Sequence, residues 1–168
     1  MLSGTVTSVF GKDINTDDII PAYQLIKSEE PEYFGRQAFE KYDPEFRARS
    51  AGQPNVVVAG KNFGCGSSRE QAVYALQHNA VVCVIAESFP DIFYRNSLAN
   101  GLPLITLPDT NGLQRGDRVD VDLEQGRIYN RTRNASVPFQ MSPEDRRTFL
   151  AGGMTARVRA HLAELLAG

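Results

Sequence analysis

The chain reads Gly60-Lys61-Asn62-Phe63-Gly64-Cys65-Gly66-Ser67-Ser68-Arg69-Glu70 between an apolar run at 56–59 and a helical pattern. Glycines at such a junction let the backbone turn tightly and approach a ligand closely. Two hydroxyls and a guanidinium follow at a helix start, where free backbone N–H groups favour anions. The stretch therefore predicts a strand-to-helix turn that binds a small carboxylate-bearing molecule.

A helix cap is the simpler interpretation of the same stretch. Ser67 and Glu70 have the spacing of a capping box, in which each side chain bonds the other residue's backbone N–H. On that interpretation the glycines only make a turn. Familiar motifs do not decide the matter: the Walker A lysine, the third glycine of the dinucleotide fingerprint and the G-x-S-x-G elbow are all missing.

Composition limits the class of protein. The length of 168 residues predicts a single domain, 1–168. A formal net charge of −2 favours neither nucleic acid nor an anionic membrane, and we find neither a signal peptide nor an apolar stretch of membrane-spanning length. The two cysteines, Cys65 and Cys83, are too few for a zinc site, an iron–sulfur cluster or a disulfide framework. We expect no cofactor in this chain and a reducing, cytoplasmic setting.

Strands and helices alternate in the middle third. We predict strands at 56–59, 81–86 and 104–107, with one helix at 68–79 and another that begins at a Ser88 cap. This order implies a parallel sheet with right-handed crossovers, and such sheets bind ligands beyond the carboxyl ends of their strands.

The flanking parts differ in pattern. A strand at 5–10 and a helix near 33–42 come before the alternation, and short antiparallel strands at 118–123, 126–129 and 135–139 follow it. A helix capped by Ser142 precedes the last helix, which has four large apolar residues on one face: Val158, Leu162, Leu165 and Leu166.

Three segments together resemble one family. They are Asp13-Ile14-Asn15-Thr16-Asp17-Asp18-Ile19-Ile20-Pro21-Ala22, the run from Asn62 to Ala72, and Ser88-Phe89-Pro90-Asp91-Ile92-Phe93-Tyr94-Arg95-Asn96-Ser97. Together they resemble the small, swivelling domain of the aconitase superfamily, and in particular the small subunits of 3-isopropylmalate dehydratase. Homoaconitase small subunits are the next most similar. Because the Gly-Ser-Ser-Arg-Glu block occurs together with Thr-Asp-x-Ile-x-Pro, the resemblance outweighs the interpretation as a cap alone.

The resemblance implies a fold, a reaction and a partner. The fold is α/β: a three-layer β/β/α swivelling domain with a mixed sheet or partial barrel and flanking helices. The reaction isomerises 2-isopropylmalate and 3-isopropylmalate by dehydration and rehydration, a step of leucine biosynthesis. The partner is a large subunit that holds a [4Fe–4S] cluster through three cysteines and forms a heterodimer or heterotetramer with the small one. We expect the face around residues 23–45 to contact it.

The resemblance also assigns roles to single residues. Ser67 resembles the base that takes a proton from carbon, Asp17 an active-site aspartate, and Ser68 and Arg69 the residues that hold a substrate carboxylate. Serine is a poor base at neutral pH, but helix-start N–H groups and Arg69 stabilise an alkoxide. A guanidinium also meets a carboxylate with a two-pronged hydrogen bond.

The resemblance implies that substrate choice depends on the loop after Pro21-Ala22, which here reads Tyr23-Gln24-Leu25-Ile26-Lys27-Ser28. Homoaconitase-type chains carry an arginine where Ile26 aligns, and an apolar residue there suits an isopropyl group and leaves an extra carboxylate unpaired. Lys27 reaches a carboxylate if the loop shifts by one residue. Two alternatives therefore remain: a small subunit of homoaconitase or of another 2-hydroxy-diacid dehydratase, and a non-catalytic module that binds anions or regulates.

Overall fold

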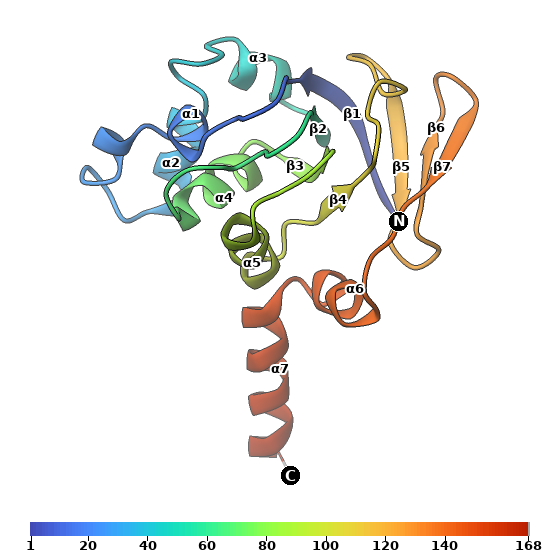
Figure 1. Ribbon diagram of the computed structural model, residues 1–168. Coiled ribbons are helices and arrows are strands. Elements are labelled where there is room, and N and C mark those ends of the chain that lie inside the picture. Colours follow the sequence, from blue (N-terminus) through green and yellow to red (C-terminus); the bar gives the residue numbers. More distant parts are fainter. Residues whose placement is uncertain (168) are drawn as a thin grey trace.

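A seven-stranded mixed sheet organises the computed structural model, which describes residues 1–167 (Figure 1). The strand order is β4-β3-β2-β1-β5-β6-β7. Neighbours from β4 to β1 are parallel, and those from β1 to β7 are antiparallel. The sequence predicts the parallel pairing of β2, β3 and β4 and the antiparallel group β5 to β7, but not the place of β1 between them. The strands are β1 (Leu2–Val9), β2 (Asn55–Ala59), β3 (Val81–Ala86), β4 (Leu104–Thr106), β5 (Arg118–Asp122), β6 (Arg127–Asn130) and β7 (Ala135–Pro138).

The helices that precede β5 in the chain lie beside the parallel strands, whereas the two that follow β7 lie outside this group (Figure 1). The helices are α1 (Thr16–Ile19), the 3-10 turn η1 (Ala22–Gln24), α2 (Pro31–Gln37), α3 (Phe46–Ser50), α4 (Glu70–Gln77), α5 (Asp91–Asn100), α6 (Pro143–Leu150) and α7 (Met154–Ala167). Within residues 1–167, none of them has the length and apolar character needed to cross a membrane.

Both faces of the parallel strands are buried. In β2, Val57 and Ala59 face the core beneath the helices, while Val56 and Val58 face a second core that β5 and β6 share. The sheet curls so that its antiparallel part covers this second face. Cys83 lies there with no exposed surface, as predicted, and burial raises the pKa of its thiol to about 12. Because side chains fill both faces, the loops at the strand ends are what can meet a ligand.

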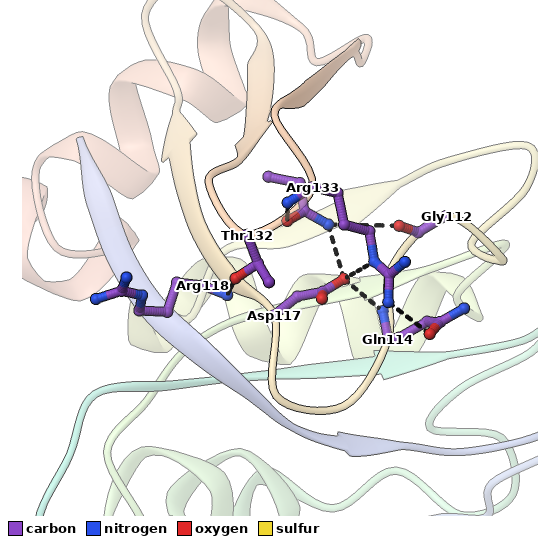
Figure 2. Close-up of polar contacts among 7 residues, drawn as sticks. Gly112, Gln114, Asp117, Arg118, Thr132 and Arg133 are labelled. Atoms are coloured by element: carbon purple, nitrogen blue, oxygen red, sulfur yellow. Dashed lines mark hydrogen bonds and ion pairs between the residues drawn. The ribbon is translucent and has the colours of Figure 1, made fainter.

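A buried carboxylate ties the antiparallel part together (Figure 2). Asp117 is 2% exposed, and its Oδ2 accepts hydrogen bonds from the Gln114 N–H at 2.9 Å, Asn130 Nδ2 at 2.7 Å and Arg133 Nε at 2.8 Å. Burial acts to raise the pKa of Asp117, but these bonds outweigh it and hold the pKa below its usual value. Arg133 stands in the turn between β6 and β7 and its side chain is 42% exposed, so it ties this turn to the buried carboxylate from the solvent side.

Two predicted helix caps are wrong. Helix α4 begins at Glu70 with Arg69 as its N-cap residue, so Ser67 lies too far upstream to close a capping box. Helix α5 begins at Asp91, after Pro90, instead of at Ser88. The Ser88 hydroxyl accepts the Asn62 N–H at 2.8 Å instead, which fastens the glycine loop to the segment before α5.

Candidate active site

The glycine loop lies beyond the carboxyl end of β2, where the predicted topology puts a ligand. Gly64 and Gly66 have φ of 87° and 90°, the left-handed region that favours glycine. A Cβ on Gly64 would lie 2.3 Å from the ring of Phe93, and one on Gly66 would lie 2.5 Å from the Asn15 amide. The glycines thus allow close packing against neighbouring protein groups, and the following residues Ser67 to Arg69 face the pocket.

The segment around α1 holds the loop from the other side. Asn15 and Asp18 form a capping box that starts α1. Thr16, which is 1% exposed, donates its N–H to the Cys65 carbonyl and its hydroxyl to the Ser67 carbonyl, each at 2.8 Å. These two bonds hold the loop on both sides of Gly66. The resemblance assigned no role to Thr16, although it stands inside one of the three segments.

Arg69 and Asp17 meet in an ion pair across 52 residues of sequence. Arg69 Nη1 lies 2.6 Å from Asp17 Oδ1 and 3.1 Å from the Ile20 carbonyl. The bond from Arg69, aided by the Ala22 N–H at 2.8 Å, lowers the pKa of Asp17 below its usual value. Asp17 is thus ionised at neutral pH. It is suited to orient Arg69 and unsuited to donate a proton.

Ser67 and Ser68 are exposed at the mouth of a pocket of about 340 Å³. The start of α5, with Asp91 and Ile92, forms the opposite wall. Asn96, one turn further along α5, donates to the Ser68 hydroxyl at 3.1 Å. Two hydroxyls and a guanidinium therefore surround a pocket open to solvent, a combination suited to a small anion.

The loop that contains Ile26 is anchored apart from this pocket. Gln24 is 4% exposed, accepts a hydrogen bond from the Tyr33 hydroxyl and donates to Glu40 at 2.8 Å. Ile26 is 89% exposed, and Lys27 places its Nζ 4.8 Å from the ring centre of Tyr23. Neither residue lines the pocket of Ser67.

A second pocket, of about 520 Å³, lies next to Asp17. Tyr23 and Lys41 line it, and Lys41 Nζ lies 4.6 Å from the centre of the Tyr23 ring. No pattern in the sequence singled out Lys41. The predicted site residues thus fall into two groups: Ser67, Ser68, Arg69 and Asp17 gather at one place, and Ile26 and Lys27 stand on a separate loop.

Comparisons with known proteins identify the family of the chain. Residues 2–110 match the family model described as the aconitase C-terminal domain. The 3-isopropylmalate dehydratase small subunit of Heliobacterium modesticaldum is 40% identical over 157 residues, which are 92% of this chain and 93% of that protein. The chain belongs to this family of small subunits. The small subunit of Metallosphaera sedula is 52% identical over 120 residues, which are 71% of this chain and 73% of that protein.

A solved structure in this small-subunit family confirms the fold. The crystal structure of 3-isopropylmalate dehydratase from Methanocaldococcus jannaschii superposes with a TM-score of 0.87 at 34% identity and covers 99% of each chain. The predicted α/β architecture with a mixed, curled sheet is therefore correct. The interpretation of the glycine loop as a helix cap is wrong, because Ser67 caps no helix.

Cys65 is the one cysteine near the glycine loop, and its surroundings do not activate its thiol. Within residues 1–167, no three His, Cys, Asp or Glu side chains lie close enough together to hold a metal ion. Cys65 is half-buried beside the loop, and burial, aided by the charge of Asp13, raises the pKa of its thiol. A protonated thiol is a weak nucleophile, so the hydroxyls of Ser67 and Ser68 are the better candidates for chemistry.

Proposed function

We propose that this chain is the small subunit of a hydro-lyase that interconverts 2-isopropylmalate and 3-isopropylmalate, and that it acts with a large subunit that carries a [4Fe–4S] cluster. One observation supports this most strongly. The exposed hydroxyls of Ser67 and Ser68 lie at the mouth of a pocket beside Arg69, which is already oriented by the ionised Asp17. Such a half-site suits a subunit that closes over a substrate held by another chain.

Ser67 is the proposed base. It removes a proton from the carbon next to the hydroxyl-bearing carbon, hydroxide leaves, and a carbon–carbon double bond forms. Water then adds back in the opposite orientation. The guanidinium of Arg69, which lines the same pocket, favours the alkoxide that Ser67 must become. The cluster in the partner supplies Lewis-acid chemistry at the departing hydroxyl when bound.

Arg69 and Ser68 are the proposed carboxylate-binding groups. The hydrogen bonds that Arg69 makes within residues 1–167 all use Nη1. Its Nε and Nη2 therefore remain for the two-pronged bond that a carboxylate accepts. Asn96 orients the Ser68 hydroxyl toward the same pocket. Asp17 contributes by keeping Arg69 in place through their ion pair.

Two residues of the exposed loop are proposed to read the substrate side chain. The apolar Ile26 suits an isopropyl group, and its 89% exposure leaves it available for the closed complex. A second candidate substrate, a homoaconitate-type acid with an extra carboxylate, is favoured by the ammonium groups of Lys27 and Lys41 around Tyr23. Ile26→Arg should lower turnover of isopropylmalate and raise that of the tricarboxylic acid. An unchanged preference would show that the loop does not read the side chain.

Reconstitution tests the proposed function as a whole. The full chain is mixed with its purified, cluster-loaded large subunit, and formation of the unsaturated intermediate from several 2-hydroxy-diacids is followed by ultraviolet absorbance. Isopropylmalate should give the highest kcat/KM, with no turnover from either subunit alone. Complex formation without turnover of any diacid would contradict the proposal. We further propose a cytoplasmic location, which the free thiols of Cys65 and Cys83 support.

A further inference from the structure

Helix α7 projects from the rest of the molecule (Figure 1). It has 14 residues, and none of them is buried. Its length is about 21 Å at 1.5 Å per residue. Isolated helices of this length are marginally stable in water, and most helices in proteins gain stability by packing an apolar face. An exposed helix of this kind therefore points to an occupant outside the part of the chain that the structure describes.

The apolar side chains of α7 form a continuous stripe. At about 100° per residue they span about 120° of the helix surface. Met154 is 40% exposed, and the stripe becomes more exposed toward the end of the helix, where Leu165 is 64% and Leu166 is 89% exposed. The full stripe consists of Met154, Val158, Leu162, Leu165 and Leu166. An unburied stripe of this width is typical of a docking helix.

The large subunit is the occupant that the chain's organisation favours. The family model for the aconitase C-terminal domain ends at residue 110, so α7 lies outside the part shared with that domain. A C-terminal domain is joined to the rest of its protein by covalent bonds. A separate small subunit loses translational and rotational entropy when it binds its partner, and interface contacts must offset that loss. Extra apolar surface outside the shared domain meets that need.

The position of α7 agrees with this assignment. The turn before it packs on the carboxyl end of α5: a Cβ on Gly153 would lie 2.5 Å from the Gly101 nitrogen. The other end of α5 forms a wall of the Ser67 pocket, where Ile92 is 53% exposed. The pocket and the base of α7 are thus joined by one helix of about 15 Å. One large partner can contact both.

A second copy of this chain fits the stripe less well. Two such helices would share a strip about 21 Å long and about 10 Å wide, far below the roughly 800 Å² per partner of a stable interface. Arg159 and His161 border the stripe, and the carboxylate of Glu164 lies on the far side. If two copies paired through this stripe, the basic residues beside one stripe would face those beside the other, which is unfavourable. A groove with carboxylates at its rim complements them.

We propose that α7 is a docking helix, whose stripe from Met154 to Leu166 binds an apolar groove with an acidic rim on the large subunit. The proposal rests on the proposed function only in requiring that a large subunit exists. Its test is the affinity of the full chain for the purified large subunit, measured by titration calorimetry. The double variant Leu162→Glu/Leu165→Glu should bind at least tenfold more weakly. The single variant Leu162→Glu should already bind more weakly, whereas Ala160→Glu, which adds the same single charge on the opposite side of α7, should bind within twofold of the wild type.

A third variant guards against unfolding of the helix. Leu166→Ser changes a side chain that the free chain leaves 89% exposed, so its unfolding temperature should match that of the wild type while its affinity falls. Equal affinities for the stripe variants and the control would overturn the proposal. So would a wild-type dimer in light scattering that Leu162→Glu separates without weakening the large-subunit complex. Stripe-dependent binding without turnover of isopropylmalate would contradict the proposed function and leave the docking helix standing.

Discussion

Replacing Asp117 by Asn removes a buried charge while it keeps the shape of the side chain. The carboxylate accepts three hydrogen bonds on one oxygen, from Gln114, Asn130 and Arg133 (Figure 2). Hydrogen bonds to charged groups contribute about 1.5–3 kcal/mol each, and neutral ones about 0.5–1.5 kcal/mol. Because one oxygen shares three donors and the Arg133 side chain is 42% exposed, we expect a loss of about 2–3 kcal/mol in the free energy of unfolding.

Thermal and urea unfolding at pH 7 measure this loss. For a chain of this size, the unfolding temperature should fall by about 5–10 °C. The matched control is Asp120→Asn on the same hairpin. Asp120 pairs with Arg131 at 2.6 Å, but the Arg131 side chain is 58% exposed, so this change should cost about 0–1 kcal/mol. Equal losses from the two variants would refute the reasoning that burial makes the Asp117 network important.

The pH dependence supplies an independent check on Asp117. Its pKa is lower in the folded chain than its ordinary value of 3.8. A carboxylate with a lowered pKa contributes stability that is fully present above the unfolded value and is lost as the pH falls through the folded value. The difference between wild type and Asp117→Asn should thus be full at pH 7 and shrink once the pH falls below 3.8. A difference that stays constant under acid conditions would mean that the charge contributes nothing.

Three further substitutions probe the site. Thr16→Val removes the bond to the Ser67 carbonyl, which should cost about 1 kcal/mol in urea unfolding and lower kcat about tenfold, while Thr16→Ser keeps both. Gly64→Ala puts a Cβ in the left-handed backbone region and against the Phe93 ring, so the free energy of unfolding should fall by about 3 kcal/mol; a stable, active variant would contradict the glycine argument. Asp17→Asn loosens the arginine and should raise KM more than it lowers kcat in steady-state assays; an effect on kcat alone would instead indicate proton transfer.

Periodicity and element order predicted most of the fold. The strands at 81–86 and 104–107 are apolar runs of sheet length, and the structure has β3 at Val81–Ala86 and β4 at Leu104–Thr106. The caps failed because a serine before a helix has more than one use. The Ser88 hydroxyl accepts a hydrogen bond from the Asn62 N–H, 26 residues away, and no local spacing reveals that partner.

The sequence pointed to the residues of the candidate site, but not to the tertiary hydrogen bonds that hold them in place. Ser67, Ser68 and Arg69 stand in one quoted stretch, and the resemblance joined them to Asp17. Thr16 and Asn96 act through tertiary hydrogen bonds across 51 and 28 residues, which a single sequence does not encode visibly. The exposure of α7 was equally hidden, since an apolar stripe on a helix ordinarily means core.

Exchange of the substrate proton with solvent tests the central claim that this chain supplies the base. The wild-type pair is incubated with isopropylmalate in deuterated water, and incorporation of deuterium at carbon is followed by mass spectrometry. Ser67→Ala should slow exchange at least about a hundredfold, while its affinity for the large subunit stays unchanged. Exchange at the wild-type rate in that variant would contradict the account, because the proton would then be taken by a group outside this loop.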